Sequence, residues 1–237
     1  VLMDDEKVDW PRAYRHIGDV VQTLGGSFYT GPDVNTGAKE LASVAEQTTY
    51  VTDPGDSGPG ELAEATAEGV FQGMAAALRS RFGAEDWASR TIVVQGLGAV
   101  GSGVARRARA LGARVVGADV LEDRALAVAD ELDIEIVDPG SAIEVPCDVF
   151  SPNALGGLLH DLSLSRLRCK IVAGGANNQL ARMLVGDELH DMGVLYTPDF
   201  VINAGALVRG TIFHLARRRE PVEAIGKRIG AVAERIL

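Results

Sequence analysis

The chain has 237 residues, 46% hydrophobic and 24% charged, which is typical of a globular protein and excludes disordered and collagen-like classes. Its 33 acidic and 23 basic residues give a net charge of −10, which disfavours non-specific binding to nucleic acid or to an anionic membrane. Because the sequence has no apolar stretch of about 18 residues and no secretory signal, we expect a cytoplasmic protein. The two cysteines, Cys147 and Cys169, lack a CxxC spacing, and the four histidines are scattered, so neither a disulfide nor a metal site is expected.

The first quarter of the chain is predicted to contain two helices around a turn-rich loop. Apolar residues recur at spacings of three and four from Asp9 to Leu24, which predicts an amphipathic helix. A short extended piece, 27–30, precedes the loop 31–37, and a second helix is predicted from Ala38 to Glu46. Residues 52–60 are rich in glycine, proline and aspartate, which indicates a loop or linker.

The rest of the chain alternates between helical and strand patterns. Small residues between Leu62 and Leu78 predict a long helix that a neighbouring layer can approach closely. After it, short β-branched runs alternate with helical stretches, which is typical of a parallel sheet with helical crossovers. The predicted strands are 92–95, 114–118, 135–137, 148–150, 170–173 and 194–197. A helical pattern with a break at 217–221 follows Ala204.

A glycine-rich turn, Gly96-Leu-Gly-Ala-Val-Gly101, joins the first of these strands to a helix. Together with an acidic residue at the end of the next strand, Asp119, it is typical of a doubly wound, dinucleotide-binding Rossmann sheet. Asp119 would bind the ribose hydroxyls and repel a 2′-phosphate, so NAD is favoured over NADP. The alternative is a purely structural turn, with Asp119 capping the next helix. The expected cofactor contacts are Gly96, Gly98, Ala99, Val100, Gly101, Asp119 and Val120.

Six segments together resemble the glutamate, leucine, phenylalanine and valine dehydrogenase superfamily, most of all its shorter NAD-dependent members. They are Gly31-Pro-Asp-Val-Asn-Thr36, Thr66-Ala-Glu-Gly-Val70, Gly96 to Gly101, Asn153-Ala-Leu-Gly-Gly157, Gly174-Gly-Ala-Asn-Asn-Gln-Leu180 and Pro198-Asp-Phe-Val-Ile-Asn-Ala-Gly205. The last two each follow a predicted strand, so their amide side chains are expected at the carboxyl edge of the sheet. The alternative is that these asparagines only cap turns.

The resemblance implies oxidative deamination of an apolar, branched-chain or aromatic L-amino acid to a 2-oxo acid and ammonium, with NAD as cofactor. Asp33 matches the catalytic aspartate, which acts as a general acid and base in a partly desolvated site; a turn or helix-capping role is the alternative. The resemblance places Thr66, Asn153, Ala154, Asn177 and Asn203 at the cofactor and Asn178, Leu207 and Gly210 at the substrate.

Three departures from the family pattern bear on activity. The family's two essential lysines would lie before Val1, since neither Lys7 nor Lys39 matches them, so the chain as given is expected to bind NAD better than it turns over a substrate. The cleft segment from Gly60 to Ala65 lacks the usual prolines, and Ala206 stands where a glycine is usual. The runner-up function is therefore a non-catalytic dinucleotide-binding regulator.

These observations predict an α/β protein in three parts. Residues 1–60 are interpreted as the remainder of a catalytic domain and 61–206 as the NAD-binding domain. Residues 207–237 are expected to form helices that pack back toward the first domain. Within them, Arg217 to Arg219 are interpreted as a solvated helix face, with a subunit or domain contact as the alternative. The resemblance also implies a homo-oligomer.

Overall fold

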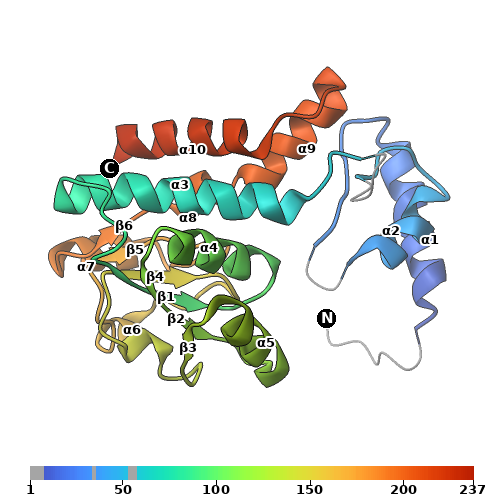
Figure 1. Cartoon of the computed structure of the whole chain (residues 1–237). Coiled ribbons are helices and arrows are strands. Elements are labelled where there is room, and N and C mark those ends of the chain that lie inside the picture. Colours follow the sequence, from blue (N-terminus) through green and yellow to red (C-terminus); the bar gives the residue numbers. More distant parts are fainter. Residues whose placement is uncertain (1–7, 34–35, 53–57) are drawn as a thin grey trace. The chain divides into compact units, whose positions relative to one another are not determined.

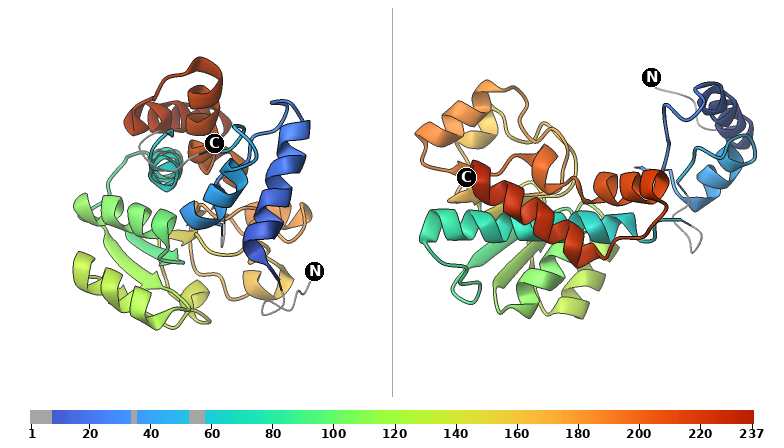
Figure 2. Two further views of the ribbon diagram at one scale, coloured as in Figure 1. Left: turned by 90° about the vertical axis from the view of Figure 1, so that its right-hand side faces the viewer. Right: turned by 90° about the horizontal axis from the view of Figure 1, so that it is seen from above.

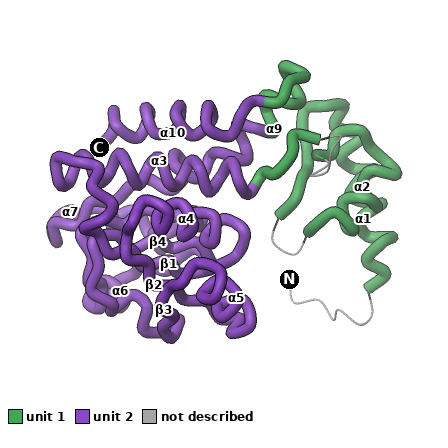
Figure 3. Tube along the Cα trace, viewed as in Figure 1, with its two compact units in different colours: residues 1–62, 210–219 green, residues 63–209, 220–237 purple. Residues whose placement is uncertain are grey.

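The computed structural model describes residues 8–33, 36–52 and 58–237 (Figure 1). The predictions for Lys7, for Val34 and Asn35 of the loop 31–37, and for residues 53–57 of the expected linker lie outside these residues. The chain divides into two compact units (Figure 3). Unit 1 comprises Val1–Leu62 and Gly210–Arg219, and unit 2 comprises Ala63–Arg209 and Glu220–Leu237.

Unit 1 is built on two short helices, α1 (Trp10–Thr23) and α2 (Ala38–Ala45), which confirm the two predicted helices to within a residue at each end. The carboxylate of Asp9 caps α1 by accepting a hydrogen bond from the Arg12 amide at 3.1 Å. Gly18 allows close packing, because a Cβ there would lie 2.6 Å from the Val44 carbonyl oxygen of α2. The extended piece 27–30 forms only a single parallel bridge, Thr30 to Val51, among the described residues.

Unit 2 contains a six-stranded sheet in the order β3-β2-β1-β4-β5-β6, in which every neighbouring pair is parallel (Figure 1). The strands are β1 (Thr91–Gln95), β2 (Arg114–Ala118), β3 (Glu135–Ile136), β4 (Val149–Pro152), β5 (Ile171–Val172) and β6 (Leu195–Tyr196). The helices of unit 2 are α3 (Leu62–Phe82), α4 (Ala99–Ala110), α5 (Glu122–Leu132), α6 (Asp161–Leu164), α7 (Leu184–Asp191), α8 (Asp199–Ile202) and α10 (Val222–Ile236), with a 3-10 turn η2 (Ala142–Glu144). Helix α9 (Gly205–Ala216) begins in unit 2 and belongs to unit 1 from Gly210 onward. The predicted α/β fold with a doubly wound sheet is confirmed, and the strand order reverses between β1 and β4.

The four inner strands, β2, β1, β4 and β5, are mostly buried on both faces, which explains why they read as apolar runs rather than alternating patterns. On β1, Ile92 and Val94 point into a core shared with α3, α4, α5 and α10, whereas Val93 points into a second core with α6 and α7. Helices therefore cover both faces of the sheet (Figure 2).

The small residues of α3 receive bulky side chains from two other helices. A Cβ at Gly73 would lie 2.2 Å from Ile202 Cγ2 of α8, and one at Gly69 would lie 2.7 Å from Ile229 Cδ1 of α10. The close approach predicted for this helix is confirmed, and α10 runs along it within unit 2 (Figure 2). Residues 220–237 thus contribute Ile225, Ile229 and Ala233 to the core of unit 2.

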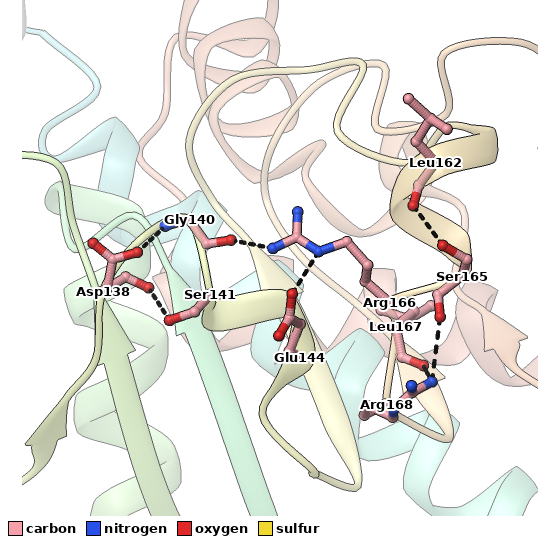
Figure 4. Close-up of polar contacts among 9 residues, drawn as sticks. All are labelled: Asp138, Gly140, Ser141, Glu144, Leu162, Ser165, Arg166, Leu167 and Arg168. Carbon is pink, nitrogen blue, oxygen red and sulfur yellow. Dashed lines mark hydrogen bonds and ion pairs between the residues drawn. The ribbon is translucent and has the colours of Figure 1, made fainter.

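Arg166 joins the two crossover connections that lead into β4 and β5 (Figure 4). Its guanidinium donates to Glu144 Oε1 and to the Gly140 carbonyl oxygen, both at 2.6 Å. The two connections are thereby held together on the face of the sheet that carries the second core. Nearby in the same core, Cys147 and Cys169 are free and half-buried. Burial raises the pKa of Cys169 to about 12, so its thiol stays protonated and unreactive at neutral pH.

No helix among the residues the structure describes combines the length and hydropathy needed to cross a membrane.

Candidate functional site

The turn between β1 and α4 contains three glycines with different surroundings. Gly96 has a φ of +88°, and a Cβ at Gly101 would lie 1.8 Å from the Gly96 carbonyl oxygen, so both glycines are required by the turn itself. A Cβ at Gly98 would meet nothing nearer than Arg124 Nη1, at 3.8 Å, among the described residues. Gly98 is also the N-cap of α4 and provides no capping side chain. The backbone beside Gly98 is therefore open to close approach by an anion at the start of a helix.

Asp119 follows β2 and binds this turn. Its Oδ2 accepts a hydrogen bond from the Leu97 amide at 2.7 Å, and its Oδ1 accepts one from the Leu121 amide at 2.9 Å. The second bond forms a local turn before α5, but the N-cap of that helix is Leu121, so Asp119 does not cap it as the structural alternative predicted. The first bond couples the acidic residue to the glycine turn 22 residues away. Val120, the next residue, is 83% exposed and lines a pocket with the four residues that follow it.

Asn153 and Ala154 follow β4, on the other side of β1. The Asn153 amide donates to the carbonyl oxygen and the hydroxyl of Ser151, and its Oδ1 accepts from the Gly175 amide at 2.8 Å. Ala154 packs against the glycine turn, since a Cβ at Gly96 would lie 2.9 Å from the Ala154 Cβ. The side chain at 153 therefore ties the end of β4 to the loop that follows β5.

The loop after β5 presents two exposed amides on a buried anchor. Asn177 and Asn178 are exposed, and Asn178 has a left-handed φ of +52°. Gln179 is fully buried, and its amide donates to the carbonyl oxygens of Gly174 at 2.6 Å and Ala176 at 3.1 Å. The sequence assigned no role to Gln179, although it lies inside the asparagine-rich segment; its buried amide fixes the backbone that presents Asn177 and Asn178.

Asn203 follows α8 and reaches the same loop. Its Nδ2 donates to Asn177 Oδ1 at 2.6 Å and to the Gly175 carbonyl oxygen at 3.3 Å. Tyr196 holds the preceding segment by donating to Asp199 at 3.0 Å, and burial raises the pKa of Tyr196, so this phenol remains a donor. The structure therefore joins the two asparagine-rich segments that the sequence singled out.

Thr66 connects α3 with the start of α9. Its hydroxyl accepts a hydrogen bond from the Ala206 amide at 3.1 Å, and a Cβ at Gly205 would lie 1.9 Å from the Ala65 carbonyl oxygen. Ala206, where the family usually has glycine, is accommodated in the second position of α9. In the cleft segment that also departs from the family, Leu62 begins α3 and Glu64 forms an ion pair with Arg107.

The three remaining predicted residues are Asp33 of unit 1 and Leu207 and Gly210 of α9. Asp33 belongs to unit 1, where its backbone closes a turn with Thr36 and the residue is exposed. The N-cap of α2 is Gly37, so Asp33 does not cap that helix. On α9, Leu207 is 73% exposed, and a Cβ at Gly210 would meet no atom of the described residues within 4 Å.

These residues fit a dinucleotide. The glycine turn, Asp119, Asn153 and the 174–178 loop follow β1, β2, β4 and β5, so they lie at one edge of the sheet around the point where its strand order reverses. Within the described part of the chain, no cluster of three or more His, Cys, Asp or Glu residues could hold a metal ion. The fold and this edge are those of the Rossmann-type α/β proteins.

Comparison with known proteins narrows the class to one family. The model of the Glutamate/Leucine/Phenylalanine/Valine dehydrogenase family matches residues 58–137. A leucine dehydrogenase from Thermoactinomyces intermedius is 34% identical over 240 residues, which cover 100% of this chain and 65% of that protein. A leucine dehydrogenase from Geobacillus stearothermophilus is 35% identical over 211 residues, covering 88% of this chain and 58% of that protein. The chain belongs to the glutamate, leucine, phenylalanine and valine dehydrogenase family.

A solved structure supports the same assignment. The crystal structure of L-tryptophan dehydrogenase from Nostoc punctiforme matches with a TM-score of 0.76 and 32% identity, over 94% of this chain and 64% of that one. The chain thus spans between 58% and 65% of the length of the relatives named here.

Proposed function

We propose that this protein is an NAD-dependent dehydrogenase that oxidatively deaminates an apolar L-amino acid, branched-chain or aromatic, to a 2-oxo acid and ammonium. The observation that carries the proposal is the gathering of the glycine turn, Asp119 and three amides, from Asn153, Asn177 and Asn203, at one edge of the sheet. Family membership and the identity to leucine and L-tryptophan dehydrogenases support it.

In this proposal the protein binds and orients, and bound NAD supplies the hydride acceptor. The backbone at Gly98, Ala99, Val100 and Gly101 would hold the pyrophosphate at the start of α4, and Asp119 and Val120 would contact the adenosine. Asn153, Ala154, Asn177, Asn203 and Thr66 would hold the nicotinamide half. Asn178, Leu207 and Gly210 would contact the amino acid, and Asp33 would transfer protons to and from ammonia and water.

The alternative is a regulator that binds the dinucleotide without catalysis. It is favoured by the cleft segment, which departs from the family pattern and in which Leu62 starts α3 and Glu64 is held by Arg107. We retain the division into 1–60, 61–206 and 207–237, with residues 220–237 of the last part packed in the core of unit 2. The homo-oligomer and the cytoplasmic location are also parts of the proposal.

Mixing the protein with NAD and a panel of L-amino acids while following NADH absorbance separates the two functions. The enzyme predicts NADH formation with leucine, valine, phenylalanine or tryptophan and none with aspartate or lysine. NAD binding measured by calorimetry without turnover of any amino acid would favour the regulator. Absence of NAD binding would contradict both functions.

A further inference from the structure

Arg124, in the first turn of α5, is bound to the acidic residue of the proposed ribose site. Its Nη1 lies 3.3 Å from Asp119 Oδ2, and this oxygen already accepts the Leu97 amide. The Asp119 side chain is 3% exposed, whereas that of Arg124 is 44% exposed. The guanidinium therefore lies on the outer side of a carboxylate that has almost no other access to solvent.

The contact with Arg124 limits how many further hydrogen bonds Asp119 can accept. A carboxylate offers about four lone-pair positions, two on each oxygen. Oδ2 uses both of its positions, for Leu97 and Arg124, and Oδ1 uses one for Leu121. Two ribose hydroxyls need two free positions, but one remains. The second becomes available only when Arg124 leaves Oδ2.

Arg124 also lies where the displaced guanidinium could meet a nucleotide. It lines a pocket of about 470 Å³ with Val120, Leu121, Glu122 and Asp123. Its Nη1 is also 3.8 Å from the position of a Cβ on Gly98. The guanidinium thus lies between the open glycine of the turn and the carboxylate that would hold the ribose.

We infer that Arg124 sets the preference between NAD and NADP, an inference that rests on the proposed function. In the free protein Arg124 occupies the ribose acceptor of Asp119; when the ribose displaces it, the guanidinium binds the 2′-phosphate of NADP. Glu122 and Asp123 line the same pocket but are exposed, so solvent screens their repulsion more than it weakens a direct guanidinium–phosphate contact. Arg124 therefore offsets the repulsion that Asp119 alone would exert, and NADP binds measurably.

The test compares Arg124→Gln with the unchanged protein by calorimetric titration with 5′-AMP and adenosine 2′,5′-bisphosphate, which probe the adenosine end without any amino acid chemistry. Loss of a charge-assisted contact should weaken the bisphosphate about tenfold, while 5′-AMP binds as well or slightly more tightly. The bisphosphate affinity should also lose much of its salt dependence in Arg124→Gln. Arg124→Lys, which keeps the charge, should fall between the two proteins.

Arg106→Gln is the matched control, because Arg106 pairs with Glu131 at the far end of α5 and lies outside the pocket. It should leave both titrations unchanged, and thermal unfolding should show all variants folded. An equal loss for both nucleotides in Arg124→Gln, or no loss for either, would overturn the role of Arg124 while leaving the dinucleotide site intact. If the unchanged protein binds neither nucleotide, the proposed function fails as well.

Discussion

The three glycines between β1 and α4 differ in what excludes a larger side chain at each position. At Gly101 the constraint is internal, because a Cβ would lie 1.8 Å from the Gly96 carbonyl oxygen. At Gly98 the described residues leave room for a Cβ, so in the proposed site the constraint comes from the ligand. The sequence motif predicted all three glycines. It could not tell a steric constraint within the turn from a constraint set by the ligand, because both require glycine at the position.

Gly101→Ala should therefore mainly lower stability, whereas Gly98→Ala should mainly weaken NAD binding. Overpacking against backbone should make Gly101→Ala lose about 1–3 kcal/mol of unfolding free energy. Gly98→Ala should lose about 1 kcal/mol or less, as expected at a helix N-cap, but should weaken NAD binding strongly. Urea unfolding and NAD titration of both variants measure this. Equal destabilisation by the two substitutions would show that Gly98 is structural too.

At the scale of elements, α3 and α4 are joined by ionic contacts that no periodicity indicates. Arg107 of α4 donates to Glu68 at 2.7 Å and to Glu64 at 2.5 Å, and Glu68 also accepts from Gln72. The side chains of Arg107 and Glu68 are 19% and 11% exposed. The sequence predicted both helices but not this contact. Arg107 and Glu68 lie 39 residues apart in the sequence, so their contact depends on how the two helices pack against each other.

Neighbouring arginines on α4 allow a matched comparison. Arg107→Ala leaves the carboxylate of Glu68 poorly solvated and should cost about 2 kcal/mol, below the range for fully buried pairs because some solvent reaches the site. Arg106→Ala breaks an exposed pair with Glu131 and should cost less than about 1 kcal/mol. Chemical denaturation of the two variants provides the measurement. Equal costs would mean that the Arg107 contacts contribute no more than a surface pair.

His214 of α9 packs within unit 1. Its Nε2 lies 2.8 Å from Thr52 Oγ1, and its ring lies 4.3 Å from that of Tyr29. Burial, together with the charge of Arg217, lowers the pKa of His214 below its usual value of about 6.5. The folded state therefore binds fewer protons here than the unfolded state, so this histidine reduces stability as the pH falls below about 6.5.

Thermal unfolding followed between about pH 7.5 and 5 should show this loss in the unchanged protein. The same scan on His214→Gln should be flatter across that window, because glutamine does not titrate. If the thermal stability of the unchanged protein and of His214→Gln changed with pH to the same extent, His214 would not be the cause of the loss at low pH.

At the scale of the whole molecule, the proposed cofactor residues and the proposed catalytic aspartate belong to different units. Every residue assigned to NAD lies in unit 2, whereas Asp33 lies in unit 1. Dinucleotide binding and proton transfer should therefore be separable by substitution.

Asp33→Asn should abolish NADH formation while changing the NAD dissociation constant by less than about twofold, since a residue outside the dinucleotide contacts contributes little to that affinity. Turnover and calorimetric titration are measured on the same preparation. Loss of both would show that the 31–37 loop has been assigned the wrong role, and retained turnover would remove Asp33 from the chemistry.

Strand and helix positions, the sheet class and the glycine turn followed from local patterns, because apolar periodicity and turn chemistry act over a few neighbouring residues. The same patterns placed Asp119 and the asparagines after strands, hence at one edge of a parallel sheet. The bonds from Asn203 to Asn177 and from Asp119 to Leu97 emerged only in the folded chain. They join residues 26 and 22 positions apart, and packing alone sets such distances. The contact between Arg124 and Asp119 is likewise decided by the tertiary structure. The two side chains come within reach of each other only when α5 has formed and packed against β2.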